Sequence, residues 1–305
     1  MKNPRLAYLA LAHKNPEQVN AFVRQIAGAG QADVYLHVDA KCPDATFRAF
    51  ASAPNVKIVA ERVSVSWGDY NGVVATLILL RAMRASGKTY DFVSLNSGQD
   101  LLVRDGLLEH LAANEGRIFM YAKKIEEGDP DNFFWRIKWP RAALGNSSPT
   151  HPSRLLRVVL RALFVLGLNP LANRHELPEN WTYHRGSQWF CVSGEAAAYM
   201  LEYLERHPSY ADAFKDSLVS DMAFFHTLIM NSPFAAKVTG AHLTYLRFGK
   251  GFRETNSPTP LTMRDLGVIA DSGLFFARKF EPSVDAEVIR YFCAKYGAGA
   301  DGQRA

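Results

Sequence analysis

Cysteine is scarce in this sequence, with only three residues in a chain of 305. Because Cys42, Cys191 and Cys293 stand far apart, they suggest neither a disulfide framework nor the close ligand spacing of a zinc site. The start of the chain, MKNPRLAYLALAHKN, has too short an apolar run for a secretory signal. We therefore expect a cytoplasmic protein whose fold depends on an apolar core.

Several nucleotide- and nucleic-acid-binding signatures are also missing. No GxGxxG follows the first predicted strand, and no Walker-type phosphate loop occurs. The net charge of +5 suits an anionic ligand, but no run of Lys and Arg accompanies it, so we expect no nucleic acid partner. Apolar residues make up 48% and charged residues 21%, as in ordinary globular proteins.

What the chain does have is a regular alternation of short apolar runs and helical patterns. Strands are expected at 6–11, 33–38, 56–60, 92–95 and 118–121, and helices at 17–27, 70–85 and 105–113. This order predicts an α/β fold with a mostly parallel, doubly wound sheet flanked by helices. We expect a single domain over residues 1–296, with a variable insertion at about 126–180 and a flexible tail at 297–305.

Polar residues follow three of the predicted strands. His13 follows the first, Asp39 the second and Asp100 the fourth. In sheets of this kind ligands bind beyond the carboxyl ends of the strands, so these residues predict a pocket for a single nucleotide. The alternative is that each residue only completes the end of its strand.

The stretch 183–232 predicts a strand at 186–192 followed by helices at 194–205 and 220–230. In the last helix Ser220 is expected to be the N-cap, with Asp221 in the positive first turn. A carboxylate there, beside Gln188 and Trp189, would serve as a general base over an apolar sugar platform. The alternative is that Asp221 only stabilises the helix end.

The apolar stretch Leu155–Leu168 is interrupted by Arg157 and Arg161 and is too short to span a bilayer. We expect an amphipathic helix that packs on the protein. The alternative is a helix that lies on a membrane surface, which would make the protein peripheral to the inner membrane.

Six motifs in order resemble a known family. They are HVDAK (37–41), SWGDYNGVVATLILLRAM (66–83), LNSGQDLLV (95–103), GSQWFCVS (186–193), FFHTLIMNS (224–232) and LFFARKF (274–280). Together they resemble the core-2/I-branching N-acetylglucosaminyltransferases and peptide O-xylosyltransferases of glycosyltransferase family 14. The resemblance extends over roughly residues 5–283.

This resemblance implies a GT-A-like fold and an inverting transfer from a UDP-sugar to a hydroxyl of a glycan or protein acceptor. The donor sugar would be N-acetylglucosamine or, alternatively, xylose. The family needs no divalent metal, which agrees with the single acid Asp100 where a DxD pair would otherwise stand. We interpret the triplet Asp129-Pro130-Asp131, which lies in the insertion, as a solvated turn.

The resemblance also assigns roles to residues. Lys279 would bind the diphosphate and, with a second cation, stabilise the charge on the departing UDP. That second cation is expected to be Arg253, with Lys250 and Arg247 as alternatives. The remaining expected contacts are Asp39 to the nucleoside, His13 and Asp100 around its pocket, Ser187, Gln188 and Trp189 beside the donor sugar, and Trp135 and Arg136 at the acceptor.

One departure from the family concerns the catalytic base. The usual glutamate, five residues before the Thr of FFHT, is replaced by Met222. We expect the neighbouring Asp221 to act as the base, with His226 as a weaker candidate. Two alternatives remain: a catalytically inactive module that binds UDP-sugars or glycans, and a nucleotidyltransferase, which would need a pair of acids for magnesium.

Overall fold

The computed structural model describes residues 3–296 except 29–31, 51–52, 127, 129–132, 139–151, 169–171 and 250–256. Several predictions therefore lie outside the described residues. They concern the triplet Asp129-Pro130-Asp131, the proposed cation Arg253, its alternative Lys250, and the tail at 297–305.

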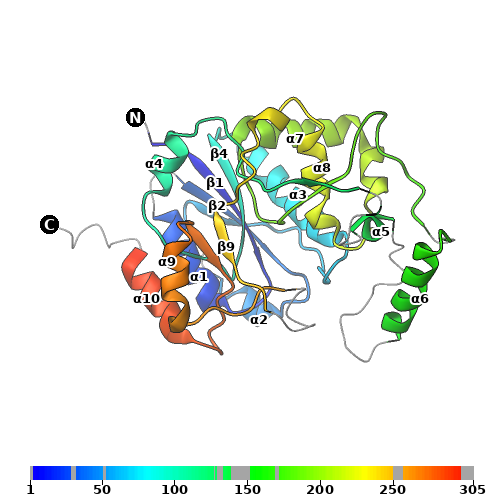
Figure 1. The fold of residues 1–305 in the computed structure, drawn as a ribbon. Helices are drawn as coiled ribbons and strands as arrows, with labels where there is room; N and C mark the ends of the chain where they lie inside the picture. Colours follow the sequence, from blue (N-terminus) through cyan, green and yellow to red (C-terminus); the bar gives the residue numbers. More distant parts are fainter. Residues whose placement is uncertain are drawn as a thin grey trace.

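A five-stranded sheet forms the centre of the protein, with the order β3-β2-β1-β4-β8 (Figure 1). Its strands are β1 Leu6–Ala12, β2 Ala32–Val38, β3 Val56–Ile58, β4 Phe92–Ser97 and β8 Cys191–Ser193. A smaller sheet has the order β5-β10-β9, and β6 pairs with β7. These strands are β5 Leu101–Leu102, β6 Lys123–Lys124, β7 His184–Arg185, β9 Thr244–Leu246 and β10 Phe276–Arg278.

Strands β1 to β4 run parallel to one another, and β8 is an antiparallel edge. Every residue of β2 and β4 is buried, as expected for parallel strands that are covered on both faces. The predicted mixed α/β architecture with a mostly parallel sheet flanked by helices is therefore confirmed. The single-domain assignment and the GT-A-like classification stay predictions.

Helices cover both faces of this sheet (Figure 1). Helices α1 and α10 pack beside β5 and the small sheet, whereas α3 packs on β1 and β2 and contacts α7, which in turn contacts α8. The helices are α1 Pro16–Ala27, α2 Asp44–Phe47, α3 Asn71–Arg84, α4 Leu107–Ala112, α5 Phe133–Ile137, α6 Ser153–Val165, α7 Gly194–Arg206, α8 Phe224–Met230, α9 Leu266–Asp271 and α10 Ala286–Tyr296. None of the helices within the described residues combines the length and apolarity needed to cross a bilayer.

The expected helix at 220–230 is divided in the structure. A 3-10 turn, Ser220–Met222, precedes α8, and Ala223 between them leaves the helical region with φ −127°. Ser220 does not cap α8, because its hydroxyl points to the carbonyl of Asp69 at 3.5 Å. Asp221 consequently lies in a separate turn and not in the first turn of the long helix, which corrects the prediction.

Of two further predicted strands, one is absent from the structure and the other is shorter than predicted. Residues 118–121 form only isolated bridges, through Ile118 and Phe119, and the strand expected at 186–192 is reduced to β8. The backbone at 186–190 still has defined partners, since the amide of Gly186 donates to the carbonyl of Met222 and the amide of Leu95 to that of Phe190. These segments make tertiary contacts instead of a continuous ladder.

Candidate functional site

The carboxyl ends of the central strands meet at one edge of the sheet, as the sequence predicted. Backbone hydrogen bonds join the loops that leave these strands: the Asp39 amide donates to Ala12, and the Gly98 amide donates to Leu11, each at 2.8 Å. The segment after β10 joins the same edge, because the Phe280 amide donates to the Gln99 carbonyl at 2.9 Å. Parts of the chain that are far apart in sequence therefore form one polar rim.

Asp39 holds the loop after β2 in place. Its carboxylate accepts from the backbone amides of Lys41 at 2.7 Å and Val65 at 3.1 Å, and the residue is 5% exposed. Arg62 braces the same loop by donating to the carbonyls of Val38, Asp39 and Cys42. Asp39 therefore completes the end of its strand, as the alternative interpretation expected. Its carboxylate also lies at the rim.

His13 lies at the rim as an exposed side chain after β1. Its pKa is below the ordinary value, first because it is partly desolvated and then because Lys14 and Arg278 are positive. Asp39 opposes this effect. His13 therefore interacts electrostatically with Asp39 after β2 and with Arg278 at the end of β10.

Asp100 has no exposed surface, so its expected part in shaping the nucleotide pocket would be through the residues that it holds. Its Oδ2 accepts from the Ser97 amide at 3.0 Å, and its Oδ1 lies 3.3 Å from Nε of Arg278. Burial raises the pKa of Asp100 to about 6, against the opposing effect of the Arg278 charge. Asp100 is thus a buried anchor for a cation.

That cation, Arg278, was not predicted as a site residue. Its guanidinium carbon lies 4.1 Å from the ring centroid of Trp189, and its terminal nitrogen donates to the Ser97 hydroxyl at 3.3 Å. Its side chain is only 11% exposed, and burial lowers its pKa. The only signal in the sequence was its position beside Lys279 in the ARKF motif.

Lys279 is half-buried at the same rim. Its ammonium group donates to the Ser257 hydroxyl at 3.1 Å, and desolvation together with the charges of Arg278 and Lys14 lowers its pKa. Glu281, two residues further on, pairs with Lys14 and accepts from Asn15 at 2.5 Å and from Gln99 at 3.1 Å. Glu281 thereby ties the loop after β1 to the segment that carries Lys279.

Arg247, one of the two expected alternatives to Arg253 as the second cation, has other partners. It pairs with Asp265 and donates to the hydroxyl of Thr259 at 3.0 Å and to the carbonyl of Pro260 at 2.6 Å. These bonds tie β9 to the start of α9 and engage most of the guanidinium donors. Arg247 is therefore mainly structural.

Asp221 lies in a tightly held turn beside the amino end of α3. A Cβ added at Gly72 would lie 3.6 Å from the Cβ of Asp221, so this helix end leaves room for the carboxylate. Its Oδ1 accepts from the Met222 amide at 3.1 Å. Burial raises the pKa of Asp221 to about 6, and the nearby charge of Asp69 acts in the same direction.

The backbone before Asp221 is strained. Val219 has a φ of +53°, which is rare for a β-branched residue and costs on the order of 1–3 kcal/mol. Its amide donates to the carbonyl of Gly68 at 2.9 Å, and Leu218 donates to Arg136 at 2.8 Å. The loop at 66–69 and helix α5 therefore impose the conformation that presents Asp221.

Met222 and His226 do not offer a base. Met222 packs its side chain against the apolar core, while its carbonyl accepts from the Gly186 amide at 2.9 Å. His226 is fully buried, and burial lowers its pKa to about 3, so it is removed from any substrate. Through Met222 and Gly186, the turn of Asp221 is joined to the partly buried Ser187, Gln188 and Trp189.

The expected acceptor contacts in α5 are not supported by their positions. Trp135 is 8% exposed and belongs to the larger apolar core, which leaves little of its ring for a ligand. Arg136 lies over the rings of Phe133 and Trp135, and desolvation lowers its pKa. The backbone of Arg136 supports the strained loop before Asp221, and its side chain is only partly exposed.

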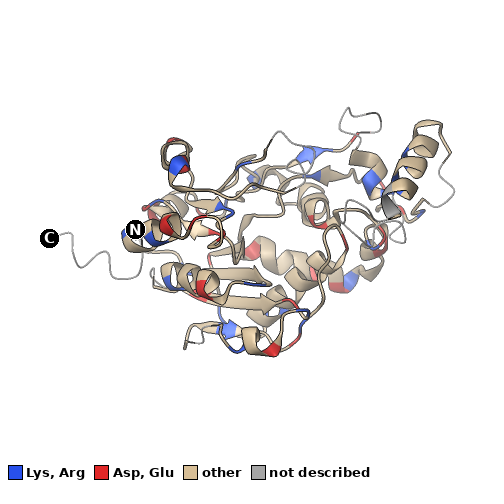
Figure 2. Cartoon of the chain, turned by 90° about the horizontal axis from the view of Figure 1, so that it is seen from below, with Lys and Arg blue, Asp and Glu red and all other residues tan. Residues whose placement is uncertain are grey.

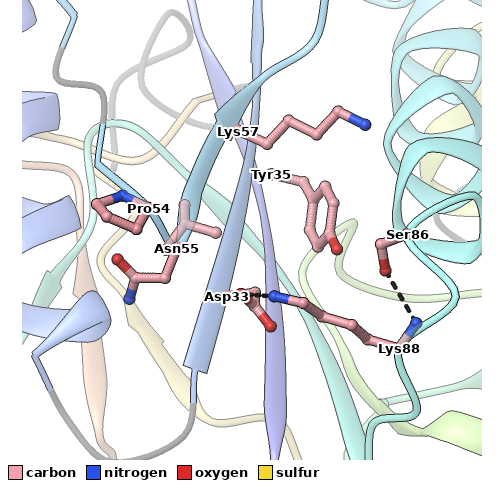
Figure 3. A pocket seen from close by; sticks show the side chains of 8 residues that line it. Asp33, Tyr35, Pro54, Asn55, Lys57, Ser86 and Lys88 are labelled. Carbon is pink, nitrogen blue, oxygen red and sulfur yellow. Dashed lines mark hydrogen bonds and ion pairs between the residues drawn. The ribbon is translucent and has the colours of Figure 1, made fainter.

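A shallow pocket at the opposite edge of the sheet is lined by polar side chains (Figure 3). Asp33, at the start of β2, accepts there from Lys88 at 2.6 Å and from the Tyr90 hydroxyl at 2.8 Å. These groups satisfy one another at the amino ends of the strands, away from the rim. We regard them as a structural ion-pair cluster.

Comparison with known proteins identifies the family. The family model of the core-2/I-branching enzymes matches residues 6–269. Two relatives, each named "Xylosyltransferase oxt", from Drosophila melanogaster and Drosophila pseudoobscura pseudoobscura, are 23% and 24% identical to this chain over 317 residues. Each alignment covers 94% of this chain and 33% of the relative, so the chain spans about a third of their length. The family model spans β1, Asp39, Trp189 and the turn of Asp221 and ends before β10. Because it matches most of the sequence, the chain belongs to the core-2/I-branching family of glycosyltransferases.

Proposed function

We propose that the protein is an inverting, metal-independent glycosyltransferase that moves a sugar from a UDP-sugar to a hydroxyl of a glycan or protein acceptor. The observation that carries this proposal is the convergence of Lys279 and Arg278 with the loops after β1, β2 and β4. Positive side chains at the carboxyl edge of a parallel sheet suit a nucleoside diphosphate.

In this proposal Asp221 is the general base. A hydroxyl is a poor nucleophile near neutral pH and needs a positioned acceptor for its proton. With a pKa of about 6, the carboxylate is ionised at pH 7 and is a stronger base than an ordinary aspartate. Its turn touches the segment 186–189, whose Trp189 contacts Arg278, so the proposed base and the leaving-group cations belong to one connected site.

Lys279 would meet the negative charge that grows on the departing UDP. It is half-buried beside Ser257, and the stacked, buried Arg278 adds a second positive charge behind it. Charge stabilisation in a partly desolvated site is stronger than in water. Among the described residues no three His, Cys, Asp or Glu side chains gather as metal ligands, and the two cations would take the role that a metal has elsewhere.

We propose N-acetylglucosamine as the donor sugar, with xylose as the alternative that the names of the relatives suggest. Calorimetric titration of UDP in buffer with EDTA tests the nucleotide site. Binding that is equal with EDTA and with added magnesium supports the proposal, whereas no binding, or binding only with magnesium, refutes it. Competition of UDP-N-acetylglucosamine and UDP-xylose then selects the donor.

Met222 favours a second candidate, a catalytically inactive module that binds UDP-sugars or glycans. The side chain at the position of the family base has no proton acceptor and packs into the core. The two candidates share UDP binding and differ in turnover. Slow hydrolysis of a UDP-sugar, or transfer to any acceptor, would exclude the inactive module, provided that Asp221→Asn removes the activity.

A further inference from the structure

Helix α6 exposes much apolar surface. Leu155 and Val165 are each 72% exposed, Leu166 is 71% and Val158 is 65%. Seven of the twelve large apolar side chains that are exposed in the described part of the chain belong to α6 and the residues just after it. This set, called here the outer face of α6, consists of Leu155, Leu156, Val158, Val159, Val165, Leu166 and Leu168.

Helical spacing gathers most of these side chains on one side. Leu155, Val158 and Val159 recur three and four residues apart, and the series continues through Ala162 to Val165 and Leu166. The other side of the helix is already used: Leu160 is 4% exposed, and Phe164 lies 6.4 Å from the ring of Phe134. The helix thus has two apolar sides, and packing on the core accounts for one. The expected packing of this helix on the protein therefore explains its buried side and leaves its exposed apolar side unexplained.

Charge around this helix has a single sign. The stretch 133–175 contains seven Arg and Lys and no Asp or Glu, although the net charge of the whole chain is only +5. The rest of the chain is therefore slightly acidic. Arg161 is exposed beside the outer face. Helix α6 lies at the periphery of the molecule (Figure 1), and its sequence contains arginines but no Asp or Glu. Figure 2 shows the Lys and Arg positions of the chain in blue.

We propose that the outer face of α6 docks on the surface of a bilayer that contains anionic lipids, with the helix parallel to the membrane plane. An apolar face beside the exposed Arg161, on a helix without Asp or Glu, fits the acyl boundary and the negative headgroups at once. A helix of 13 residues is too short to cross the hydrocarbon layer, so it would lie in the interface.

A second copy of the chain is a poorer occupant of the same face. A symmetric dimer would bring the same patch from both subunits together. Arg161 of one subunit would then approach the positive stretch 133–175 of the other, which contains no Asp or Glu. Like charges across an interface oppose association, whereas a negative lipid surface attracts them. Charge complementarity therefore selects the membrane.

The test is sedimentation of the full chain with sucrose-loaded vesicles. One set contains phosphatidylcholine alone, and the other contains phosphatidylcholine with about one-third phosphatidylglycerol, near the charge of anionic membrane leaflets. We expect binding to the second set, at least tenfold weaker binding to the first, and loss of binding as sodium chloride is raised toward 1 M, where the Debye length is only about 3 Å.

Variants locate the contact. Leu155→Glu with Leu166→Glu should lower the partition coefficient at least tenfold, because both side chains leave water on docking and glutamate adds repulsion. The matched control, Val268→Glu with Val284→Glu, changes two side chains that are 49% and 54% exposed elsewhere and should leave binding unchanged. Arg161→Gln should lower binding about fivefold, and the exposed Arg264→Gln should not.

All six substituted positions are exposed, so the circular dichroism spectra and melting temperatures of the variants should match those of the wild type. Absence of binding to anionic vesicles at low salt overturns the proposal, and so does equal binding by the Leu155→Glu, Leu166→Glu variant. Analytical ultracentrifugation tests for self-association. If the wild type is a dimer that does not bind vesicles, and this variant is a monomer, the outer face is assigned to self-association. None of these results depends on the proposed transferase activity.

Discussion

Arg278 stacks on Trp189, with its guanidinium carbon 4.1 Å from the ring centroid, while its Nε lies 3.3 Å from the buried carboxylate of Asp100. This contact joins the end of β10 to the segment before β8. It also places a positive charge directly beside Lys279. In the proposed function, this contact links Trp189, assigned to the donor sugar, to Lys279, assigned to the diphosphate.

Arg278→Lys should therefore weaken UDP binding about tenfold even though the charge is kept. A lysine has no planar group to stack on Trp189, and it cannot hold that position while it pairs with Asp100 and Ser97. Calorimetry with UDP measures the change, and the exposed Arg264→Lys is the matched control. An unchanged affinity would show that the stacked pair is only part of the scaffold.

Asp221→Asn should lower turnover by about 100- to 10,000-fold, since the amide cannot accept the acceptor proton. UDP affinity should stay within a few-fold. In the wild type, kcat/KM should fall about tenfold per pH unit below pH 6, because the base is then protonated. Asp216→Asn, at an exposed position, should change neither quantity.

Thermal melting separates loss of catalysis from loss of folding in this variant. The pKa of Asp221 is raised in the folded state from 3.8 to about 6, so ionisation there disfavours folding. This cost develops as pH rises from about 4 to 6 and is complete above it. Asp221→Asn should then be more stable than the wild type at pH 7.5, by about 1–2 kcal/mol after allowance for partial exposure. A less stable variant would contradict the assigned environment.

Lys279→Met should reduce UDP affinity about 10- to 100-fold, because a hydrogen-bonded charge pair with the diphosphate is lost from a partly desolvated site. Lys57→Met offers a control at the opposite edge of the sheet, in the pocket of Figure 3, and should have no effect. Titration of UDP and of uridine distinguishes the phosphate contribution. Equal losses for both ligands would mean that Lys279 does not face the phosphates.

Gly68→Ala should destabilise the fold more than Gly87→Ala. Both glycines have positive φ, +80° and +70°, so each substitution carries a similar backbone cost of about 1 kcal/mol. A Cβ at Gly68 would also lie 2.7 Å from Cδ1 of Leu218, whereas nothing lies within 4 Å at Gly87. Denaturant melts measure the difference. Gly68→Ala should in addition lower turnover, because Leu218 precedes the turn of Asp221, and equal turnover in both variants would oppose that link.

The alternation of apolar runs and helical patterns predicted the parallel sheet, and it also predicted that His13, Asp39 and Asp100 would follow its strands. That inference succeeds because the carboxyl ends of parallel strands must share an edge. It could not show that Asp100 and Trp135 are buried, because burial depends on which distant segments cover a side chain. The FFHTLIM pattern likewise indicated a helix, yet local propensity says nothing of contacts to residues 68 and 69 that separate the turn of Asp221 from α8.

The sequence by itself determined the layered α/β architecture, the family and the presence of a lone acid beside Met222, since period, motif order and residue identity are local properties. Only the tertiary structure decided that Arg278 lies between Trp189 and Asp100, that strain at Val219 presents Asp221, and that half of an amphipathic helix stays uncovered. The physical reason is that stacking, desolvation and exposure are set by neighbours that lie tens to hundreds of residues away along the chain, and no local pattern encodes their distance.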